Sequence, residues 1–423
     1  MSKVFETVSM IGLGYIGLPT AAMLASRKIR VIGVDINQKA VDTINQGRIH
    51  IVEPELDILV SAAVTQGYLR ATTKPEPADA FLIAVPTPFK GEFEPDLSYV
   101  HAAAVSIAPV LKRGDLVILE STSPVGTTEQ MAEWLAELRP DLSFPQTAFS
   151  DADINVAYCP ERVLPGKVVH ELVSNDRVIG GMTQRCAERA TALYKNFVDA
   201  ECVTTTVRTA EMCKLTENSF RDINIAFANE LSIICEKLSI DVWELINLAN
   251  RHPRVNILKP GPGVGGHCIA VDPWFIVSKN PEEAKLVKTG RQVNDSKPVW
   301  VLAQVEAAVA EYLRANDKYT ASDVTIACFG LTFKPDIDDL RESPALSIVA
   351  ELAKMHRGKV LAVEPNIDEL PLLVPRTVEL VDIEQAVTRA HVAIMLVDHK
   401  AFKHLNREAF RGIATINVCR EDF

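Results

Sequence analysis

The hydrophobic positions of this chain form short apolar runs that alternate with longer amphipathic segments. In the first half these runs are TVSMI (7–11), VIGVD (31–35), AFLIAV (80–85), LVILE (116–120) and NVAY (155–158), and all but the second end in a turn that contains Gly, Pro, Ser or Thr. The pattern returns at VTIACF (324–329), KVLAV (359–363) and VAIMLV (392–397). Strand-length runs separated by helical segments are typical of parallel sheets with crossover helices. The pattern therefore predicts an α/β fold with two Rossmann-like, doubly wound domains.

A long helical segment separates the two halves. Residues 209–238 contain neither Pro nor Gly, and their apolar spacing predicts an amphipathic helix long enough to join two domains or to form a dimer interface. Another helical pattern covers 297–315 and leads into a polar linker at 315–323. We therefore expect a first Rossmann domain over 1–208, a central helix and dimerisation region over 209–315, and a second Rossmann-like domain over 316–423.

Composition limits the partners of the protein. At 423 residues the chain is too long for one core, and its net charge of -11 argues against nucleic acid or an anionic membrane as the main partner. The sequence has no signal-peptide pattern and no apolar run near the ~18 residues that span a bilayer. Its eight cysteines lack CxxC pairs, so neither a metal site nor a disulfide framework is indicated. We expect a cytoplasmic protein with reduced thiols and no membrane insertion.

A dinucleotide fingerprint follows the first predicted strand. Its residues are Gly12, Gly14, Tyr15, Ile16 and Gly17, and Asp35 ends the next strand. In this strand–turn–helix–strand context the glycines let a pyrophosphate approach the backbone N–H groups of a helix N-terminus. Asp35 can accept hydrogen bonds from a ribose diol and would repel a 2′-phosphate. The sequence therefore predicts NAD, rather than NADP, as cofactor.

Further polar residues stand where predicted strands end. Thr87 and Thr122 follow two of the strands, and Thr128 begins the next helical segment. Their hydroxyls could reach a cofactor or a water, or could be ordinary helix caps. Glu161 and Arg162 lie on a Pro-bounded loop after 155–158. They are either a solvated ion pair or a base beside a phosphate or sugar contact.

The central helix and the loop after it carry a row of hydrogen-bond donors. Lys214, Asn218 and Arg221 recur at i, i+4 and i+7 and so share one helix face. Such a row suits a bound anion or a developing oxyanion, although a solvated face is the alternative. His252 and Arg254 lie in the loop NRHPRVN (250–256), which either contacts the substrate or is a surface turn.

The stretch GPGVGGHCIAVDP (261–273) combines a Gly-rich loop with Cys268 and Asp272. Glycines allow the backbone to approach a ligand closely. A thiol beside a carboxylate on such a loop is what covalent acyl chemistry needs. From this stretch alone, a turn with a buried cysteine is an equal alternative.

Seven motifs together carry a resemblance over nearly the whole chain. They are GLGYIGLP (12–19), VPTP (85–88), STSPVG (121–126), PERVLPG (160–166), EMCKLTENSFRDINIAFANE (211–230), GPGVGGHCIAVDP (261–273) and FKPDIDDLRESPA (333–345). In this order they resemble the UDP-glucose/GDP-mannose dehydrogenases, which are nucleotide-sugar 6-dehydrogenases. The resemblance implies that one site oxidises a C6 alcohol to a carboxylate with two NAD molecules. It also implies that Cys268 is the nucleophile, forming first a thiohemiacetal and then a thioester.

The resemblance also implies roles for the other motif residues. Lys214 and Asn218 would hold the C6 oxygen, Asp272 and Thr122 would orient a water or tune Lys214, and Glu161 would be a base. The fingerprint residues, Thr87, Thr128 and Arg341 would bind NAD. The UDP-sugar would contact Arg162, Val163, Lys214, Asn218, Arg221, Gly265, Phe333 and Lys334, with His252 and Arg254 from the neighbouring subunit of a homodimer. Pro165 departs from the family pattern, which often has a second glutamate at that position.

The motifs also point to a substrate within the family. NRHPRVN and GGHCIAVDPWF are most similar to the members that oxidise UDP-N-acetyl-D-mannosamine, for bacterial surface polysaccharide of the enterobacterial common antigen type. UDP-glucose or another nucleotide sugar is the close alternative. A single-step dehydrogenase of the hydroxyacid type, which needs no cysteine, and a non-catalytic NAD-binding protein are more distant ones.

Overall fold

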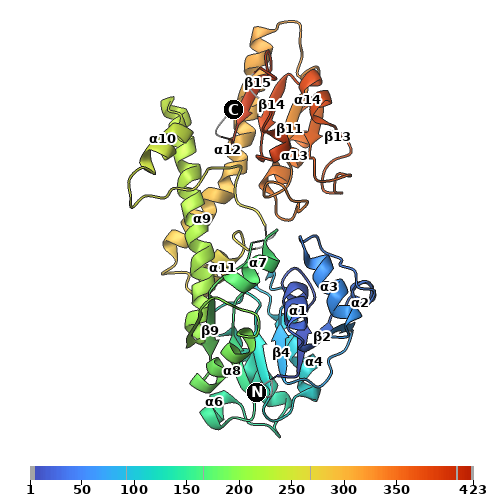
Figure 1. Cartoon of the computed structure of the whole chain (residues 1–423). Helices are drawn as coiled ribbons and strands as arrows, with labels where there is room; N and C mark the ends of the chain where they lie inside the picture. The colour runs from blue at the N-terminus through green and yellow to red at the C-terminus, as the bar shows by residue number, and fades with distance from the viewer. Residues whose placement is uncertain (1–4, 92, 165, 267, 406–407, 421–423) are drawn as a thin grey trace. The chain divides into compact units, whose positions relative to one another are not determined.

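The computed structural model describes residues 5–420 apart from 92, 165, 267 and 406–407. The chain divides into two compact units, Met1–Glu217 and Asn218–Phe423, which are blue to green and green to red in Figure 1. Each unit contains one doubly wound sheet, so the predicted fold class is confirmed. The division into three domains expected from the sequence stays a prediction.

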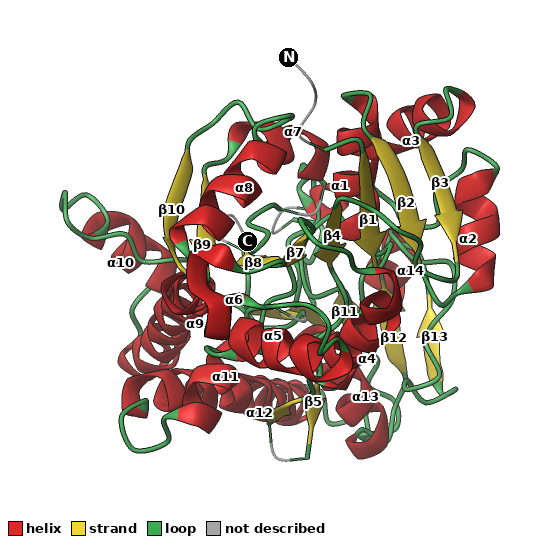
Figure 2. Ribbon diagram, turned by 90° about the horizontal axis from the view of Figure 1, so that it is seen from below, coloured by secondary structure: helices red, strands yellow, loops and turns green. Residues whose placement is uncertain are grey.

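The sheet of the first unit contains a six-stranded parallel Rossmann core. Its spatial order is β3 (Leu69–Thr72), β2 (Arg30–Val34), β1 (Thr7–Ile11), β4 (Ala80–Ile83), β7 (Leu116–Leu119) and β8 (Asn155–Tyr158). Two more strands follow, β9 (Arg177–Gly181), antiparallel to β8, and β10 (Cys202–Thr206), parallel to β9. The order reverses between β1 and β4, and parallel sheets of this kind bind ligands at the carboxyl edge of that point. Figure 2 shows β1, β2 and β3 side by side.

Helices cover both faces of this sheet because alternate strand residues point to opposite sides. Leu82 packs with Leu18 of α1 in one core, whereas Phe81 packs with Val100 of α4 and Met131 of α5 in another. The helices are α1 (Gly17–Ser26), α2 (Gln38–Asn45), α3 (Leu56–Thr65), α4 (Ser98–Ile107), α5 (Thr127–Leu138), α6 (Pro145–Ala148), α7 (Val168–Ser174) and α8 (Gln184–Tyr194). A short antiparallel pair, β5 (Phe89–Lys90) and β6 (Glu94–Pro95), lies outside the main sheet.

The sheet of the second unit is entirely parallel. Its order is β13 (Val378–Leu380), β12 (Val360–Val363), β11 (Ile326–Phe329), β14 (Val392–Met395) and β15 (Ala414–Asn417). The reversal lies between β11 and β14, so the expected ligand edge is formed by the turns that follow these strands. Helices α13 (Pro344–Met355) and α14 (Ile383–Arg389) connect the strands.

Two long helices account for the central segment. Helix α9 (Val207–Leu238) ends where Ser239 turns to a φ of 56°, and α10 (Val242–Ala249) and α11 (Asp272–Lys279) follow. Helix α12 (Lys285–Ala315) starts well before the predicted residue 297 and continues through Pro298. The predicted start was wrong, since this helix holds a proline in its interior although proline normally belongs in the first helical turn. Here buried side chains of α12, among them Arg291 and Asn294, bond to Asp222 of α9, and this packing keeps the helix intact.

Within the described residues, no helix is both long enough and apolar enough to cross a bilayer.

Helix α5 has an unusual N-terminal cap. Its N-cap residue, Gly126, has no side chain to offer, and Glu211 of α9 takes that role. The fully buried carboxylate of Glu211 accepts hydrogen bonds from the N–H groups of Gly126 (2.7 Å) and Thr128 (2.8 Å) and from the Thr128 hydroxyl (2.7 Å). A negative group at a helix N-terminus is also favoured by the helix dipole.

We expect Glu211→Gln to lower the free energy of unfolding by about 1–3 kcal/mol, because an amide cannot accept all three bonds at a buried site. Glu129→Gln is the matched control, since Glu129 lies in the first turn of α5 itself but pairs with the exposed Arg208, and such pairs contribute about 0–1 kcal/mol. Urea denaturation would measure both variants. Equal losses in the two variants would contradict the capping role.

Candidate active site

The dinucleotide fingerprint forms a tight turn between β1 and α1. A Cβ on Gly17 would lie 1.8 Å from the carbonyl oxygen of Gly12, so only glycine fits there. A Cβ on Gly14 would meet nothing within 4 Å, which leaves that side of the turn open to a ligand. Ile16 precedes α1 without a side-chain cap, and Tyr15 is exposed. The turn thus presents the N-terminus of α1, as binding of a pyrophosphate requires.

Asp35 lies directly beside this turn. Its carboxylate accepts hydrogen bonds from the backbone N–H groups of Leu13 (3.0 Å) and Asn37 (2.8 Å). The structure therefore brings together the glycines and the acid that were predicted to bind the pyrophosphate and the ribose. The residues present fit NAD.

The turns after β4 and β7 are joined to each other at the same sheet edge. The Thr87 hydroxyl donates to the carbonyl oxygen of Thr122 (2.6 Å), and the Ser121 hydroxyl donates to that of Val85 (2.7 Å). Thr87 and Thr122, both half-buried, are thus neighbours as predicted. Thr128 differs, because its hydroxyl is buried and donates to Glu211. Its predicted contact with the cofactor stays a prediction, and its visible role is structural.

Glu161 is held by a partner that the sequence did not reveal. Its buried carboxylate pairs with Arg177 of β9 (2.8 Å) and accepts the N–H of Arg162 (2.7 Å). Arg177 is itself buried and lies over the ring of Tyr194. Glu161 and Arg162 are therefore not the solvated pair that was one alternative, since the Arg162 guanidinium pairs with Glu217 instead (2.7 Å). Val163 is half-buried on the same loop, and Pro165 lies outside the described residues.

A second buried acid belongs to the same cluster. Glu120 follows β7, and its carboxyl accepts a hydrogen bond from the Tyr194 hydroxyl (2.6 Å). Burial raises the pKa of Glu120 to about 7, and the negative charge of Glu161 adds to the rise, while the hydrogen bond from Tyr194 opposes it. The only signal in the sequence was a glutamate at the end of an apolar run.

On the central helix, the structure joins two of the predicted catalytic residues. The buried Asn218 donates its side-chain amide to the buried carboxylate of Asp272, the first residue of α11. Lys214, half-buried, lies one turn earlier on α9, whereas Arg221 is exposed. The helix therefore presents Lys214 and Asn218 on consecutive turns, and Asn218 ties it to the segment that carries Cys268.

The Gly-rich loop presents an exposed cysteine. The Cys268 carbonyl accepts hydrogen bonds from the N–H groups of Val271 (3.1 Å) and Asp272 (2.8 Å), so the cysteine stands on the turn that starts α11. The alternative of a buried, structural cysteine is therefore excluded.

A chain of polar side chains holds the beginning of this loop, and no motif in the sequence indicates it. The Gly261 N–H donates to Asn229 (2.8 Å), Asn229 donates to Asn294 (2.9 Å), and Asn294 donates to Asp222 (2.8 Å). Asp222 is paired with the buried Arg291. In the sequence, these residues are only single polar positions within helices.

The end of the loop packs against the segment after β11. A Cβ on Gly265 would lie 2.4 Å from the Glu342 carbonyl oxygen, and one on Gly266 would lie 2.8 Å from the Phe333 ring. The Gly266 N–H donates to the Arg341 carbonyl (3.2 Å). Gly265, Phe333 and Arg341 are thus brought together, although the Arg341 guanidinium pairs with Asp339. Lys334 is half-buried, and His252 and Arg254 are exposed on the loop after α10.

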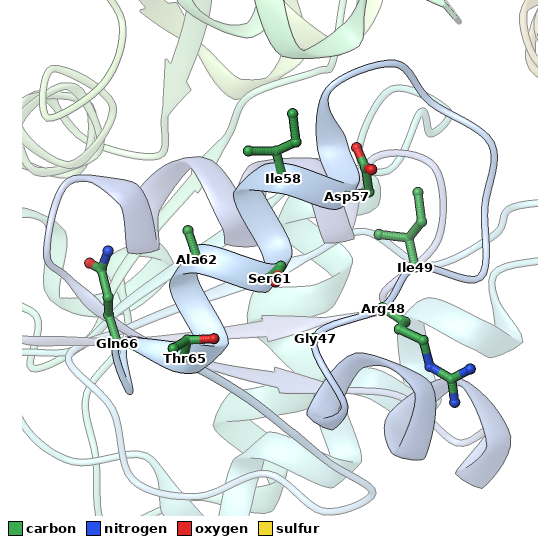
Figure 3. A pocket seen from close by; sticks show the side chains of 9 residues that line it. All are labelled: Gly47, Arg48, Ile49, Asp57, Ile58, Ser61, Ala62, Thr65 and Gln66. Atoms are coloured by element: carbon green, nitrogen blue, oxygen red, sulfur yellow. The ribbon is translucent and has the colours of Figure 1, made fainter.

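Other features of the described residues do not add to this site. No group of three or more His, Cys, Asp or Glu side chains among them could hold a metal ion. A surface pocket of about 770 Å³ lies between the turn after α2 and helix α3 (Figure 3). Its lining, which includes Arg48, Asp57 and Ser61, contains no residue predicted for the active site.

Comparison with known proteins assigns the family. Residues 6–198 match the NAD-binding domain of the UDP-glucose/GDP-mannose dehydrogenase family, residues 208–296 its central domain, and residues 327–419 its UDP-binding domain. The chain belongs to this family. It is therefore an NAD-dependent nucleotide-sugar dehydrogenase, as the motifs predicted.

Individual relatives of the chain are named for particular nucleotide sugars. The chain is 69% identical to a UDP-N-acetyl-D-mannosamine dehydrogenase of Yersinia pestis, over 96% of both chains. It is 62% identical to an NDP-N-acetyl-D-galactosaminuronic acid dehydrogenase of Ralstonia nicotianae, over 98% of this chain and 96% of the relative. The solved structure of a UDP-D-ManNAc dehydrogenase from Pyrococcus horikoshii matches with a TM-score of 0.87 and 38% identity, over 98% of this chain and 95% of the other.

The buried Glu120 predicts a specific pH dependence of stability. Because its pKa is raised above the unfolded value of about 4.3 to about 7, the folded protein holds a proton that the unfolded chain releases. This contribution is present below the unfolded pKa and is lost as the pH rises through about 7. We expect Glu120→Gln to lose less stability than the wild type from about pH 5 to about pH 8, as measured by urea denaturation. Parallel curves for the two proteins would contradict the assignment.

Proposed function

We propose that this enzyme oxidises UDP-N-acetyl-D-mannosamine at C6 to the uronate, using two NAD molecules per sugar. The observation that carries the chemistry is the exposed Cys268. It follows the Gly265–Gly266 segment that packs on Phe333 of the UDP-binding domain, and it precedes Asp272, the partner of Asn218. The sugar is inferred from the relative in Yersinia pestis, which is 69% identical and named for UDP-N-acetyl-D-mannosamine. Thiol chemistry at Cys268 fits the cytoplasm, where thiols stay reduced.

In this proposal Cys268 holds the sugar between two oxidations. The C6 alcohol first loses a hydride and its hydroxyl proton to become an aldehyde. The thiol then adds across the C=O bond to form a thiohemiacetal, which loses a second hydride and its hydroxyl proton to give a thioester. Water hydrolyses the thioester to the carboxylate and returns the thiol. NAD, when bound, accepts the hydride in each oxidation.

The other residues assigned to the reaction move protons and hold oxygens in this scheme. Lys214 stabilises negative charge on the C6 oxygen, and Asn218, held by Asp272, donates a hydrogen bond to the same oxygen or to the attacking water. Thr122 orients that water. Glu161 is the carboxylate proposed as base, and its geometry is set by Arg177. The fingerprint residues, Thr87 and Arg341 bind NAD, and Phe333 and Lys334 bind the UDP-sugar with Arg162, Val163, Arg221 and Gly265.

The thiol mechanism predicts a stoichiometry. We expect two NADH per UDP-N-acetyl-D-mannosamine. We expect Cys268→Ser to abolish acid formation, because a serine hydroxyl is a weaker nucleophile toward the aldehyde than a thiolate and its ester is less activated for hydrolysis than a thioester. Absorbance at the NADH band together with mass spectrometry of the sugar would measure both. Cys202→Ser, which changes a half-buried thiol on β10, is the control and should keep full turnover. One NADH per sugar would eliminate the four-electron mechanism.

A second candidate substrate is the N-acetylgalactosamine nucleotide, because one relative at 62% identity is named for the corresponding acid. A panel of UDP-N-acetylmannosamine, UDP-N-acetylgalactosamine and UDP-glucose would decide. We expect kcat/KM to be highest for the mannosamine sugar. Turnover of UDP-glucose alone would reject the proposed substrate.

We further infer that the enzyme is a homodimer in which a second copy covers α9. Large apolar side chains recur at seven-residue spacing on the exposed side of this helix, at Phe220 (68% exposed), Phe227 (49%) and Ile234 (44%). Isolated exposed apolar residues are common, but a continuous stripe on one helix is typical of an interface. In such a dimer the exposed His252 and Arg254 would be available to the neighbouring active site.

The dimer predicts the effect of charges on this stripe. We expect Phe220→Glu combined with Phe227→Glu to give a monomer, as measured by size-exclusion chromatography with light scattering, because two carboxylates would have to be buried. Ile58→Glu is the control, since Ile58 has the same exposure of 68% but lies on α3. A wild-type protein that elutes as a monomer would refute the homodimer.

A further inference from the structure

A glutamate and a histidine form a buried pair at the carboxyl edge of the second sheet. Glu364 directly follows β12 and His399 follows β14. Both side chains are fully buried, and Nε2 of His399 lies 3.0 Å from Oε2 of Glu364. A buried charge costs free energy unless it is hydrogen-bonded. The hydrogen-bond partners of Glu364 and His399 therefore indicate the role of the pair.

Most of these partners belong to the loop after β11. Glu364 accepts hydrogen bonds from the N–H groups of Leu331 (2.8 Å) and Thr332 (3.2 Å), and Nδ1 of His399 accepts the N–H of Asp336 (3.0 Å). The loop has no helix or strand of its own, and Asp336 has a left-handed φ of 60°. Its backbone is thus held at both ends by the two buried side chains.

The contacts determine the state of the histidine ring. Nδ1 receives the N–H of Asp336 and lies 3.1 Å from the side-chain amide of Asn366, so it carries no proton. Nε2–H then donates to Glu364, which makes the ring neutral with one defined tautomer. Burial acts to raise the pKa of Glu364, but the hydrogen bonds from His399 and Leu331 outweigh it and keep the pKa below its ordinary value. The carboxylate is therefore charged.

The loop held in this way carries residues assigned to substrate binding. Phe333 and Lys334 lie between the two anchored ends, and the Thr332 hydroxyl donates to the Lys334 carbonyl (2.9 Å). The loop follows β11, at the point where the strand order of the sheet reverses and nucleotides bind in such folds. The Phe333 ring also touches the Gly265–Gly266 segment before Cys268.

We propose that His399 and Glu364 are positioning residues for the nucleotide sugar: their hydrogen bonds to Leu331, Thr332 and Asp336 hold loop 331–336 in its binding conformation. This proposal rests on the proposed function, since it assumes that Phe333 and Lys334 contact the UDP-sugar. If the loop had to be ordered by the ligand, part of the binding free energy would be spent on that ordering. The buried pair removes this cost before the ligand arrives.

A matched pair of variants separates positioning from packing. Asn and Leu have nearly the same size, and both lose the Nε2 contact with Glu364. Only His399→Asn keeps an oxygen near the Nδ1 position that can accept the Asp336 N–H. We therefore expect His399→Leu to weaken UDP binding by about tenfold, the factor for one net hydrogen bond. His399→Asn should stay close to the wild type.

Isothermal titration of the full-length variants with UDP, and separately with NAD, gives the readout. Steady-state kinetics should show a higher KM for the UDP-sugar, with the KM for NAD and kcat little changed. Glu364→Gln provides an independent variant, because an amide retains only one acceptor for the loop, and it too should weaken UDP binding. Circular dichroism verifies that each variant is folded.

The outcomes distinguish this proposal from the function on which it rests. If the wild type failed to bind UDP, the assignment of Phe333 and Lys334 to the UDP-sugar would fail first. If the wild type binds UDP while His399→Leu and Glu364→Gln bind it equally tightly, the positioning role is overturned alone. An equal loss in His399→Asn and His399→Leu would contradict the role of the acceptor at Nδ1, because only that acceptor distinguishes the two variants.

Discussion

The close packing of the Gly-rich loop on the segment after β11 is the constraint on which the second unit depends. The backbone of Gly265 approaches Glu342 to a distance that leaves no room for a Cβ, and Gly266 lies against the Phe333 ring. The cysteine loop and the UDP-binding segment therefore have one joint conformation. Any side chain at these glycines would move Cys268 relative to Phe333 and Lys334. The physical origin of the motif is thus a contact between two loops, in addition to any contact with ligand.

The buried ion pairs of this protein hold loops in place through hydrogen bonds. Arg177 holds Glu161 after β8, Arg291 and Asp222 anchor the start of the cysteine loop through Asn294 and Asn229, and His399 with Glu364 holds the loop after β11. Each pair is buried, whereas exposed pairs such as Lys354–Glu351 connect neighbouring turns of one helix. Burying ions costs desolvation free energy. That cost is offset here by hydrogen bonds to backbone groups that no regular structure satisfies.

Sequence reasoning succeeded where the signal is local. The predicted strands and the fingerprint with Asp35 depend on spacing within a few tens of residues, and the structure contains all of them. It also contains strands that were not predicted, among them β3, β9 and β13, and it decides that Cys268 is exposed. Sequence reasoning failed at the start of α12, which begins at Lys285 and not at the predicted residue 297, and contacts with Asp222 hold the helix through Pro298. It also offered Glu161 and Arg162 as a possible mutual pair, although each has a different partner.

The sequence by itself determined the fold class, the dinucleotide turn and the position of the Gly-rich loop before Cys268, because apolar periodicity and glycine spacing act over short distances along the chain. Only the tertiary structure decided which groups support them. In the first unit Glu120 meets Tyr194 of α8 and Glu161 meets Arg177 at the start of β9, and in the second unit His399 meets Glu364, because folding brings together segments that are far apart along the chain. Burial of the Glu120 carboxyl then raises its pKa to about 7. Neither these contacts nor the burial of the residues can be deduced from the order of residues along the chain.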